Sequence, residues 1–308
     1  MVHASSRRHR LSLPLCPKGN TMQLKANFIN DWLDILKDIL ENHWGYDISS
    51  INEEEIPFVY FNAEKRRPDQ RVRNIAIADT FSCPSNLQKG WKQLRSLVES
   101  GSDITPYLSK LISRLTKKDS MLNDWGVHHF HLGEAMKGDF INRTGPLLFS
   151  LVTKDKFYAI GVYEHGSWAD SDIVETIHRN WPEVVKHYQL NGVQSTTEIT
   201  EEQRLTLRAK NVNSFVAVSD GTVYAPIGGG VVGAGYNWQS IMQTDRQKSI
   251  LENLENHLQS QLINLRDVLS QHGYKGEPEI EAKLEITENA YLAIFPKFNV
   301  AVTLMSGA

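Results

Sequence analysis

Three histidines within four residues are the feature of this sequence that folding alone explains least. They are His128, His129 and His131, in the stretch WGVHHFHLG at residues 125–133. Histidine is the side chain whose unperturbed pKa is nearest to neutrality, so such a cluster indicates proton transfer or metal binding. Alternate side chains of a strand share a face. We therefore expect His129 and His131 on one face, and His128 on the other with Phe130 and Leu132.

A second group of reactive side chains flanks two expected strands. Arg143 and Thr144 come directly before the strand at 146–153, and Glu164 and His165 follow the strand at 156–163. An antiparallel pair returns the chain to the level at which it began. His165 is therefore expected close to Arg143.

Two chemistries fit these groups. In the first, no metal is used: His129 and His131 are the general acid and base on an RNA 2′-hydroxyl and its leaving 5′-oxygen, with His165 as an auxiliary. Arg143, with Thr144 beside it, holds the phosphate by paired hydrogen bonds. In the second, His129 and His131 bind a divalent metal together with a carboxylate such as Glu134 or Glu164. The sequence contains no HExxH, CxxC or DxD-type cluster, which ranks the metal site second.

A glycine-rich stretch offers a further motif. Gly228, Gly230 and Gly233 match GxGxxG, and the stretch is expected between a strand and a helix. The preceding strand is one arm of a hairpin, however, and no βαβ unit surrounds it. The pattern favours a flexible glycine loop lying against the sheet or the site over a dinucleotide site.

The elements that must position these groups follow from hydrophobic spacing and turn signals. Helices are expected at 28–40, 85–100, from 105 to 116, at 171–180, at 200–210 and, as one long helix, at 237–271. Strands are expected at 57–61, 74–78, 127–132, 146–153, 156–163, 214–219, 222–227, 279–287, 290–295 and 298–304. We thus predict an α+β protein with a central antiparallel sheet packed by helices and a C-terminal α+β portion built on the long helix.

The charge of the chain is unevenly distributed although the net charge is only −3. Residues 61–118 contain twelve Lys or Arg and five Asp or Glu. Segregation of this kind creates a local positive field, which suits nucleic acid. The basic residues expected to guide RNA are Arg66, Arg67, Arg71, Arg73, Lys92 and Arg95.

Composition and length set the remaining expectations. The 308 residues include only Cys16 and Cys83, which excludes a disulfide framework and fits a cytoplasmic protein. No apolar run is long enough to cross a membrane. Residues 1–21 are expected to be a disordered tail or a remnant. We expect two domains, at 22–190 and 191–308, and a homodimer through the long helix as an alternative to core packing.

The predicted order of elements resembles a known group of enzymes. The strand at 57–61, two helices and the strands at 127–132, 146–153 and 156–163 give the order β-α-α-β-β-β. With basic helices and His/Arg chemistry on the sheet, residues 55–165 resemble the RelE-like toxins and the metal-independent ribonucleases that include barnase and the EndoU enzymes. The segment 66–83 departs from the compact toxin pattern as an insertion. The resemblance implies RNA cleavage without a cofactor.

Four local strings carry a separate resemblance. DWGVHHFHLG, RTGPLLFSLV, VYEHGSWAD and IHRNWP resemble an uncharacterised bacterial family of mobile elements or phage-defence islands. This implies a toxin or defence nuclease with RNA as its substrate and an antitoxin or defence-system protein as a partner. The alternatives are a metal-dependent hydrolase that uses the HxH pair and a non-enzymatic sensor or interaction protein.

Overall fold

The computed structural model describes residues 22–194 and 199–307, so the predicted tail at 1–21 lies outside the described residues. The chain is an α+β protein, as the sequence predicts. It divides into two compact units: one comprises the residues up to Trp32 and those from Ser249 onward, and the other comprises Leu33–Lys248. This division does not coincide with the boundary expected at 190/191, which lies inside the larger unit. No helix in the described part of the chain is long and apolar enough to span a membrane.

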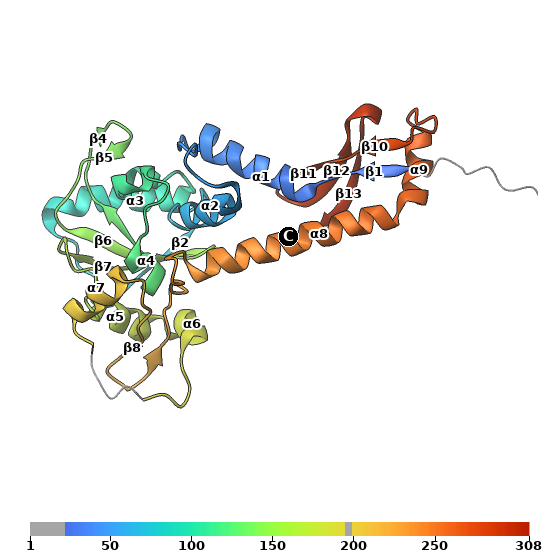
Figure 1. Cartoon of the computed structure of the whole chain (residues 1–308). Coiled ribbons are helices and arrows are strands. Elements are labelled where there is room, and N and C mark those ends of the chain that lie inside the picture. Colours follow the sequence, from blue (N-terminus) through green and yellow to red (C-terminus); the bar gives the residue numbers. More distant parts are fainter. Residues whose placement is uncertain (1–21, 195–198, 308) are drawn as a thin grey trace, which may run out of the picture. The chain divides into compact units, whose positions relative to one another are not determined.

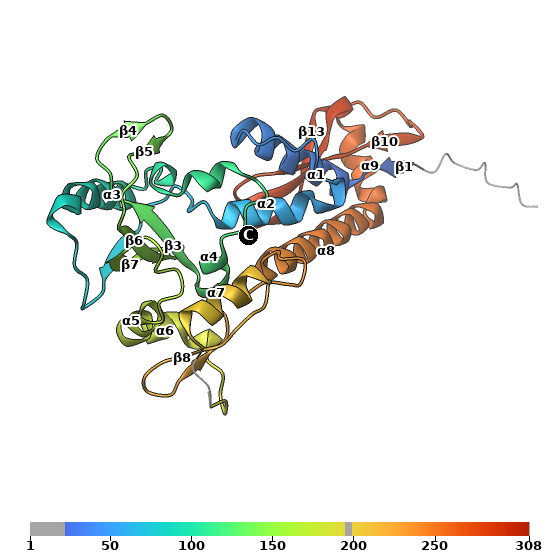
Figure 2. The ribbon, with the colours of Figure 1, turned by 60° about the vertical axis from the view of Figure 1, so that its left-hand side comes forward.

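A four-stranded sheet organises the larger unit. Its strand order is β2-β7-β6-β3, with β2 parallel to β7 and the other neighbours antiparallel. The strands are β2 (Asn74–Ile77), β3 (Val127–His131), β6 (Leu147–Val152) and β7 (Lys156–Tyr163). Figure 2 shows β3 continuing directly from the short helix α4 (Ser120–Trp125). The strands expected at 74–78, 127–132, 146–153 and 156–163 are therefore confirmed.

The two faces of this sheet bury different side chains because strand residues alternate. Leu148, Phe130 and Phe157 pack on the face covered by α3 (Gln88–Ser100). Phe149 and Ile160 pack on the opposite face, against α5 (Asp172–Asn180) and α6 (Pro182–Val185). Figure 1 shows α3 and α5 on opposite sides of the sheet. The sheet is therefore the middle layer of three, and its buried faces fix the orientation of every strand residue.

Local signals in the sequence explain where the helices stop and start. Gly101 adopts φ +73° directly after α3, the left-handed conformation that ends helices. Thr200 and Gln203 form a reciprocal capping box at the start of α7 (Glu201–Ala209). α5 ends before Trp181-Pro182, as expected from the restriction that proline places on the residue before it.

Two predicted elements differ from the structure. The expected strand at 57–61 is part of helix α2 (Ile56–Lys65). Proline is tolerated in the first turn of a helix, and Ile56, Val59 and Ala63 form one buried stripe at helical spacing. The helix expected from 105 to 116 is instead two short 3-10 turns, Thr105–Tyr107 and Lys110–Ser113. The β-α-α-β-β-β order on which the topological resemblance rests thus lacks its first strand and its second helix where they were expected. It is kept only if β2 replaces the segment 57–61 and α4 replaces the segment 105–116.

The smaller unit contains two small sheets, parts of two helices and one complete helix. β1 (Gln23–Lys25) pairs in parallel with β10 (Glu279–Glu281). A meander follows, made of β11 (Lys283–Ile286), β12 (Ala290–Phe295) and β13 (Val300–Ser306). The expected C-terminal hairpin and last strand are thus present. The expected long helix is α8 (Trp238–Ser260) followed by α9 (Leu262–Ser270), with a break at Gln261.

The remaining elements are short, apart from α1. The first helix is α1 (Phe28–Asp38), which continues as a π-helical turn at Ile39–His43. Two-residue strands are β4 (Met136–Lys137), β5 (Phe140–Ile141), β8 (Val216–Ala217) and β9 (Val223–Tyr224). Further 3-10 turns are Glu53–Glu55, Ser85–Leu87, Lys186–Tyr188 and Pro296–Phe298.

Candidate active site

A short helix followed by a strand brings a carboxylate against the histidine cluster. The Asp119 Oδ1 atom accepts the N–H of Leu122 at 3.0 Å and so caps the start of α4. Gly126, with φ +72°, ends α4 and leads directly into β3. The chain thereby folds back on itself, and the Asp119 Oδ2 atom lies 3.7 Å from the Nδ1 atom of His129.

The register of the sheet gathers the other reactive side chains at one end. His131 is opposite Leu147, which is opposite Tyr163, so the three residues form a row across β3, β6 and β7. Arg143 lies four residues before Leu147, and His165 lies two residues after Tyr163. Both loops therefore leave the sheet at the end occupied by His131, as the sequence predicts for Arg143 and His165.

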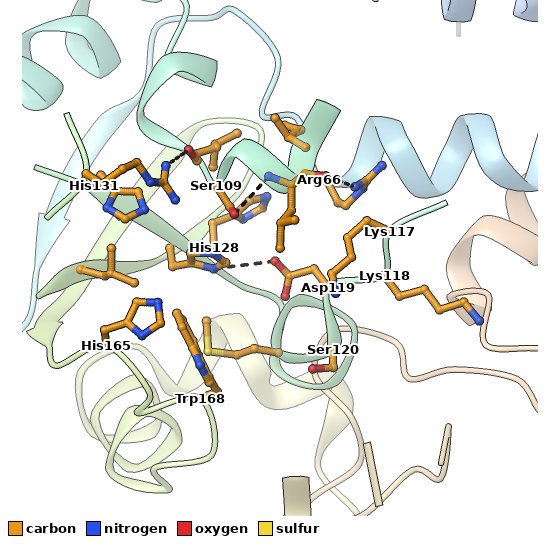
Figure 3. Close-up of a pocket in the computed structure, with 17 residues that line it drawn as sticks. Arg66, Ser109, Lys117, Lys118, Asp119, Ser120, His128, His131, His165 and Trp168 are labelled. Atoms are coloured by element: carbon orange, nitrogen blue, oxygen red, sulfur yellow. Dashed lines mark hydrogen bonds and ion pairs between the residues drawn. The ribbon is translucent and has the colours of Figure 1, made fainter. Parts of the chain in front are cut away.

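These residues line one cavity of about 340 Å³. Figure 3 shows His131, His165 and Trp168 around one side of it, Lys117 and Lys118 at the other, and Asp119 between them. The apolar part of the wall comes from Leu108, Leu111, Ile112, Met121 and Leu147. The charged residues that line it are Arg66, Lys117, Lys118 and Arg143, with Asp119 as the one lining carboxylate among the described residues.

His129 combines partial burial with access to the cavity. Its side chain keeps 15% of its exposure, and its ring lies 4.9 Å from the ring of Trp168. His165 lies on another edge of the same indole, at 5.2 Å between ring centroids. Burial lowers the pKa of His129; the Asp119 carboxylate opposes this shift, and Arg143 and His165 add to it. His129 is therefore a neutral base at neutral pH, and His165 is close enough to influence it.

His131 is held differently, by a bond to the backbone. Its Nδ1 atom accepts the N–H of Thr144 at 3.0 Å, and the residue is only 3% exposed. The Thr144 hydroxyl donates to the carbonyl of Pro146 at 2.7 Å and accepts the N–H of Leu132 at 3.2 Å. Burial first, then the charges of Arg143 and His129, lower the pKa of His131 to about 3. These contacts favour His129 and His165 over His131 for proton transfer, and they make Thr144 a residue that positions His131.

His128 is a structural histidine on the strand face that the sequence predicts. Its Nε2 atom donates to the carbonyl of Lys65 at 3.2 Å, and its ring stacks on that of Phe130. Burial lowers its pKa to about 4, so it stays neutral at physiological pH.

Arg143 is anchored at the cavity wall. Its Nη1 atom donates to the carbonyl of Leu108 at 2.8 Å. This single anchor leaves the other guanidinium N–H groups available, and guanidinium is the side-chain group best suited to binding two phosphate oxygens at once. The structure therefore places Arg143 where the phosphate-binding role expected of it is feasible.

The six basic residues expected to guide RNA are not gathered around this cavity. Arg66 lines it, but its N–H groups donate to the backbone carbonyls of Leu111, Arg114 and Leu115. Arg73 donates to the carbonyls of Thr153 and Asp69 in the same way. Both guanidinium groups are buried and support the fold.

The other four lie elsewhere in the larger unit. Arg67 lies over the rings of Trp44 and Tyr46, at 5.4 Å from each centroid. Arg71 pairs with Asp69 at 2.6 Å. Lys92 and Arg95 are on the exposed side of α3, where Arg95 pairs with Glu99. Besides Arg66 and Arg143, the cations that line the cavity are Lys117 and Lys118.

Sequence reasoning missed Asp119, Lys117 and Lys118 as site residues. The signal available for Asp119 was local: an aspartate, a six-residue helix and a glycine directly before the histidine strand. Nothing in the sequence separates Lys117 and Lys118 from the other cations of the basic region. Their position depends on where the loop before α4 lies in the folded chain.

Several backbone N–H groups of the glycine-rich loop are already hydrogen-bonded within the protein, so the loop is unsuited to cradling a phosphate. The N–H groups of Gly228, Gly230 and Val231 donate to the Asp124 carbonyl, the Asn123 carbonyl and the Asn213 side chain. A phosphate cradle needs such N–H groups to be free. The loop carbonyls accept from the protein as well, since Lys65 donates to Gly228 and Lys118 to Ala234. Hydrogen bonds thus hold the loop in place on both sides, whereas the sequence pattern predicts a flexible loop there.

The described residues contain no group of three His, Cys, Asp or Glu side chains placed to hold a metal ion. No protein-family model matches the chain, and neither comparison, with curated proteins or with solved structures, finds a significant match. Function is therefore argued from the geometry of the site.

Proposed function

We propose that this protein is a metal-independent endoribonuclease. Neutral His129 removes the proton from an RNA 2′-hydroxyl, and the 2′-oxygen attacks the adjacent phosphorus. His165 is the general acid that donates a proton to the leaving 5′-oxygen, so the P–O5′ bond breaks. Arg143 holds the phosphate oxygens. The products are a 2′,3′-cyclic phosphate and a 5′-hydroxyl, and the step needs neither water nor an electron carrier.

One observation carries this proposal: His129, His165 and Arg143 meet in a single cavity, with the Asp119 carboxylate against His129. A base made neutral by burial, a second imidazole and a guanidinium can together supply the general base, the general acid and the electrostatic stabilisation that speed phosphodiester transfer. Each acid or base of this type contributes roughly 10²–10⁴-fold to the rate.

The size of the cavity limits the form of the RNA. A volume of about 340 Å³ holds a small molecule or one nucleotide. A double helix cannot enter it, and proteins generally reach unpaired bases in loops, bulges and single strands. The substrate we propose is therefore unpaired RNA, with Lys117 contacting a phosphate beside the cleaved bond.

The biological setting we propose is that of a toxin or phage-defence nuclease. Its support is the resemblance of the four local strings described above. An antitoxin or defence-system protein is the expected partner. Induced expression of the wild-type chain should stop growth of a bacterial host, whereas a His129→Ala/His165→Ala variant should not.

The test of the activity is incubation of the purified protein with RNA, with and without a chelator, beside Arg143→Ala. The proposal expects cleavage that survives the chelator, products with 2′,3′-cyclic phosphate ends, and loss of cleavage when the 2′-hydroxyl at the cut is replaced by hydrogen. Activity that disappears with the chelator and returns with zinc or manganese would instead support the metal-dependent hydrolase. Absence of cleavage across diverse RNAs would support the non-enzymatic alternative.

A further inference from the structure

His131 is fixed by the backbone in one tautomer. The Nδ1 atom accepts the N–H of Thr144 at 3.0 Å, so it carries a lone pair and no proton. The single proton of the neutral ring is then on Nε2. Thr144 is itself held by two bonds through its hydroxyl, one to Pro146 and one to Leu132. The ring therefore has little freedom to rotate or to exchange its tautomer.

The surroundings of His131 also keep the ring uncharged. The residue is nearly fully buried yet borders the cavity, and the charges that act on it are those of Arg143, His129 and His165. A second positive charge beside Arg143 is disfavoured there, since no carboxylate offsets it. An imidazole with a pKa of about 3 is too weak a base to remove a proton efficiently. An Nε2–H that is held rigidly in a neutral ring is suited to stabilising negative charge.

We propose that His131 is a fixed neutral hydrogen-bond donor that binds a non-bridging phosphate oxygen through Nε2–H as charge develops on it. This inference rests on the proposed function and gives His131 a role different from those of His129 and His165. Arg143 supplies the positive charge at the phosphate, and His131 supplies a directed donor that needs no reorganisation during the reaction.

The first test measures the tautomer and the charge of the His131 ring directly and does not depend on activity. Two-bond ¹H–¹⁵N NMR spectra of the histidine rings distinguish the two neutral tautomers and the charged form. We expect the His131 signals to stay in the neutral Nε2–H pattern from pH 8 to pH 5. A neutral Nδ1–H pattern, or titration within that range, would overturn the inference.

The second test uses two substitutions of His131 whose amide side chains differ in length. In His131→Asn, the side-chain oxygen takes the position of Nδ1 and still accepts the Thr144 N–H, but no donor reaches the cavity. In His131→Gln, the amide nitrogen takes the position of Nε2 and restores a donor. We expect the Asn variant to lose kcat on the order of 10²–10³-fold, with KM and both limbs of the pH profile unchanged, and the Gln variant to recover part of the loss.

The outcomes separate this inference from the proposed function. If wild-type protein cleaves no RNA, the proposed function fails, whatever the ring spectra show. If wild-type protein cleaves RNA and His131→Asn, shown to be folded by its thermal transition, keeps full kcat or shifts a limb of the pH profile, the donor role is wrong. A Gln variant no better than a folded Asn variant would also contradict it.

Discussion

The carboxylate of Asp119 serves two partners with its two oxygens. Oδ1 accepts the N–H of Leu122 and caps α4, while Oδ2 lies 3.7 Å from the Nδ1 atom of His129. The cap fixes the direction of the carboxylate, and the fixed carboxylate sets the electrostatic environment of the imidazole. The same residue thus couples the start of a helix to the chemistry of the next strand.

Asp119→Asn separates these two roles. Asparagine caps helices as well as aspartate does, so the variant should keep its thermal stability. The negative charge that raises the pKa of His129 is lost, so this pKa falls further. Since His129 must be neutral to act, activity is present above its pKa and lost below it, and the acid limb of the pH–rate profile should move to lower pH. We also expect kcat to fall by roughly 10-fold, because a weaker base accepts the proton less readily.

The control for this prediction is Asp119→Ala. It removes the cap as well as the charge, so it should lower the free energy of unfolding by about 1 kcal/mol in addition to shifting the profile. An acid limb at the same pH in Asp119→Asn and in the wild type would show that the carboxylate does not act on His129.

Arg143→Lys should behave more like Arg143→Ala than like the wild type. The guanidinium is anchored to the carbonyl of Leu108 by one N–H and has others free for phosphate, whereas an ammonium group cannot span both partners in the same geometry. We expect both variants to lose kcat/KM by roughly 10–100-fold, the equivalent of one charge-assisted hydrogen bond. Steady-state kinetics on a short RNA measure this loss. Full activity in the Lys variant would mean that only the positive charge matters.

Buried neutral histidines should make the fold sensitive to acid. His128 has a pKa of about 4 in the folded chain, against about 6.5 when exposed. Between these values the unfolded chain binds the extra proton, so the stability is fully present above pH 6.5 and declines as pH falls toward 4. His128 alone should reduce the free energy of unfolding by roughly 2 kcal/mol at pH 5.

His128→Gln tests this assignment, because glutamine does not titrate and keeps a donor for the Lys65 carbonyl. Urea unfolding at pH 7 and pH 5 should show a smaller difference for the variant than for the wild type. An equal difference would assign the acid sensitivity to other groups, of which His131, with its pKa of about 3, is the next candidate.

Two glycines of the same loop should differ sharply in their tolerance of alanine. A Cβ atom added at Gly228 would lie 2.1 Å from the carbonyl oxygen of Leu122, so Gly228→Ala must displace backbone next to α4. We expect a loss of about 3 kcal/mol or more, together with reduced activity, because α4 positions Asp119. At Gly233 an added Cβ meets nothing within 4 Å, and Gly233→Ala should be close to neutral. Thermal and urea unfolding of the two variants provide the comparison.

Much of the central sheet was readable from local patterns. Short, nearly continuous apolar runs predicted β6 and β7, and the turn between them predicted their antiparallel pairing. That pairing is why Arg143 and His165 could be expected at the same end of the sheet. Segment 57–61 was misread because Val59, Tyr60 and Phe61 favour strands, whereas burial of Ile56, Val59 and Ala63 on one side stabilises a helix. Strand propensity is a weak predictor of secondary structure where tertiary packing favours the other state.

The sequence by itself determined that His129 and His131 share a strand face, because side-chain alternation is a property of any strand. Only the tertiary structure decided that the two rings differ in chemistry. One lies beside a carboxylate from the preceding loop, and the other accepts a backbone N–H in a nearly sealed position. The same holds for the cations. The density of positive charge is visible along the chain, but contacts between residues far apart in sequence decide how each guanidinium is used. Arg66 donates to several backbone carbonyls, whereas Arg143 donates to one carbonyl and keeps its other N–H groups available beside the cavity. Desolvation and hydrogen-bond partners are set by those contacts, and they determine which imidazole can move a proton.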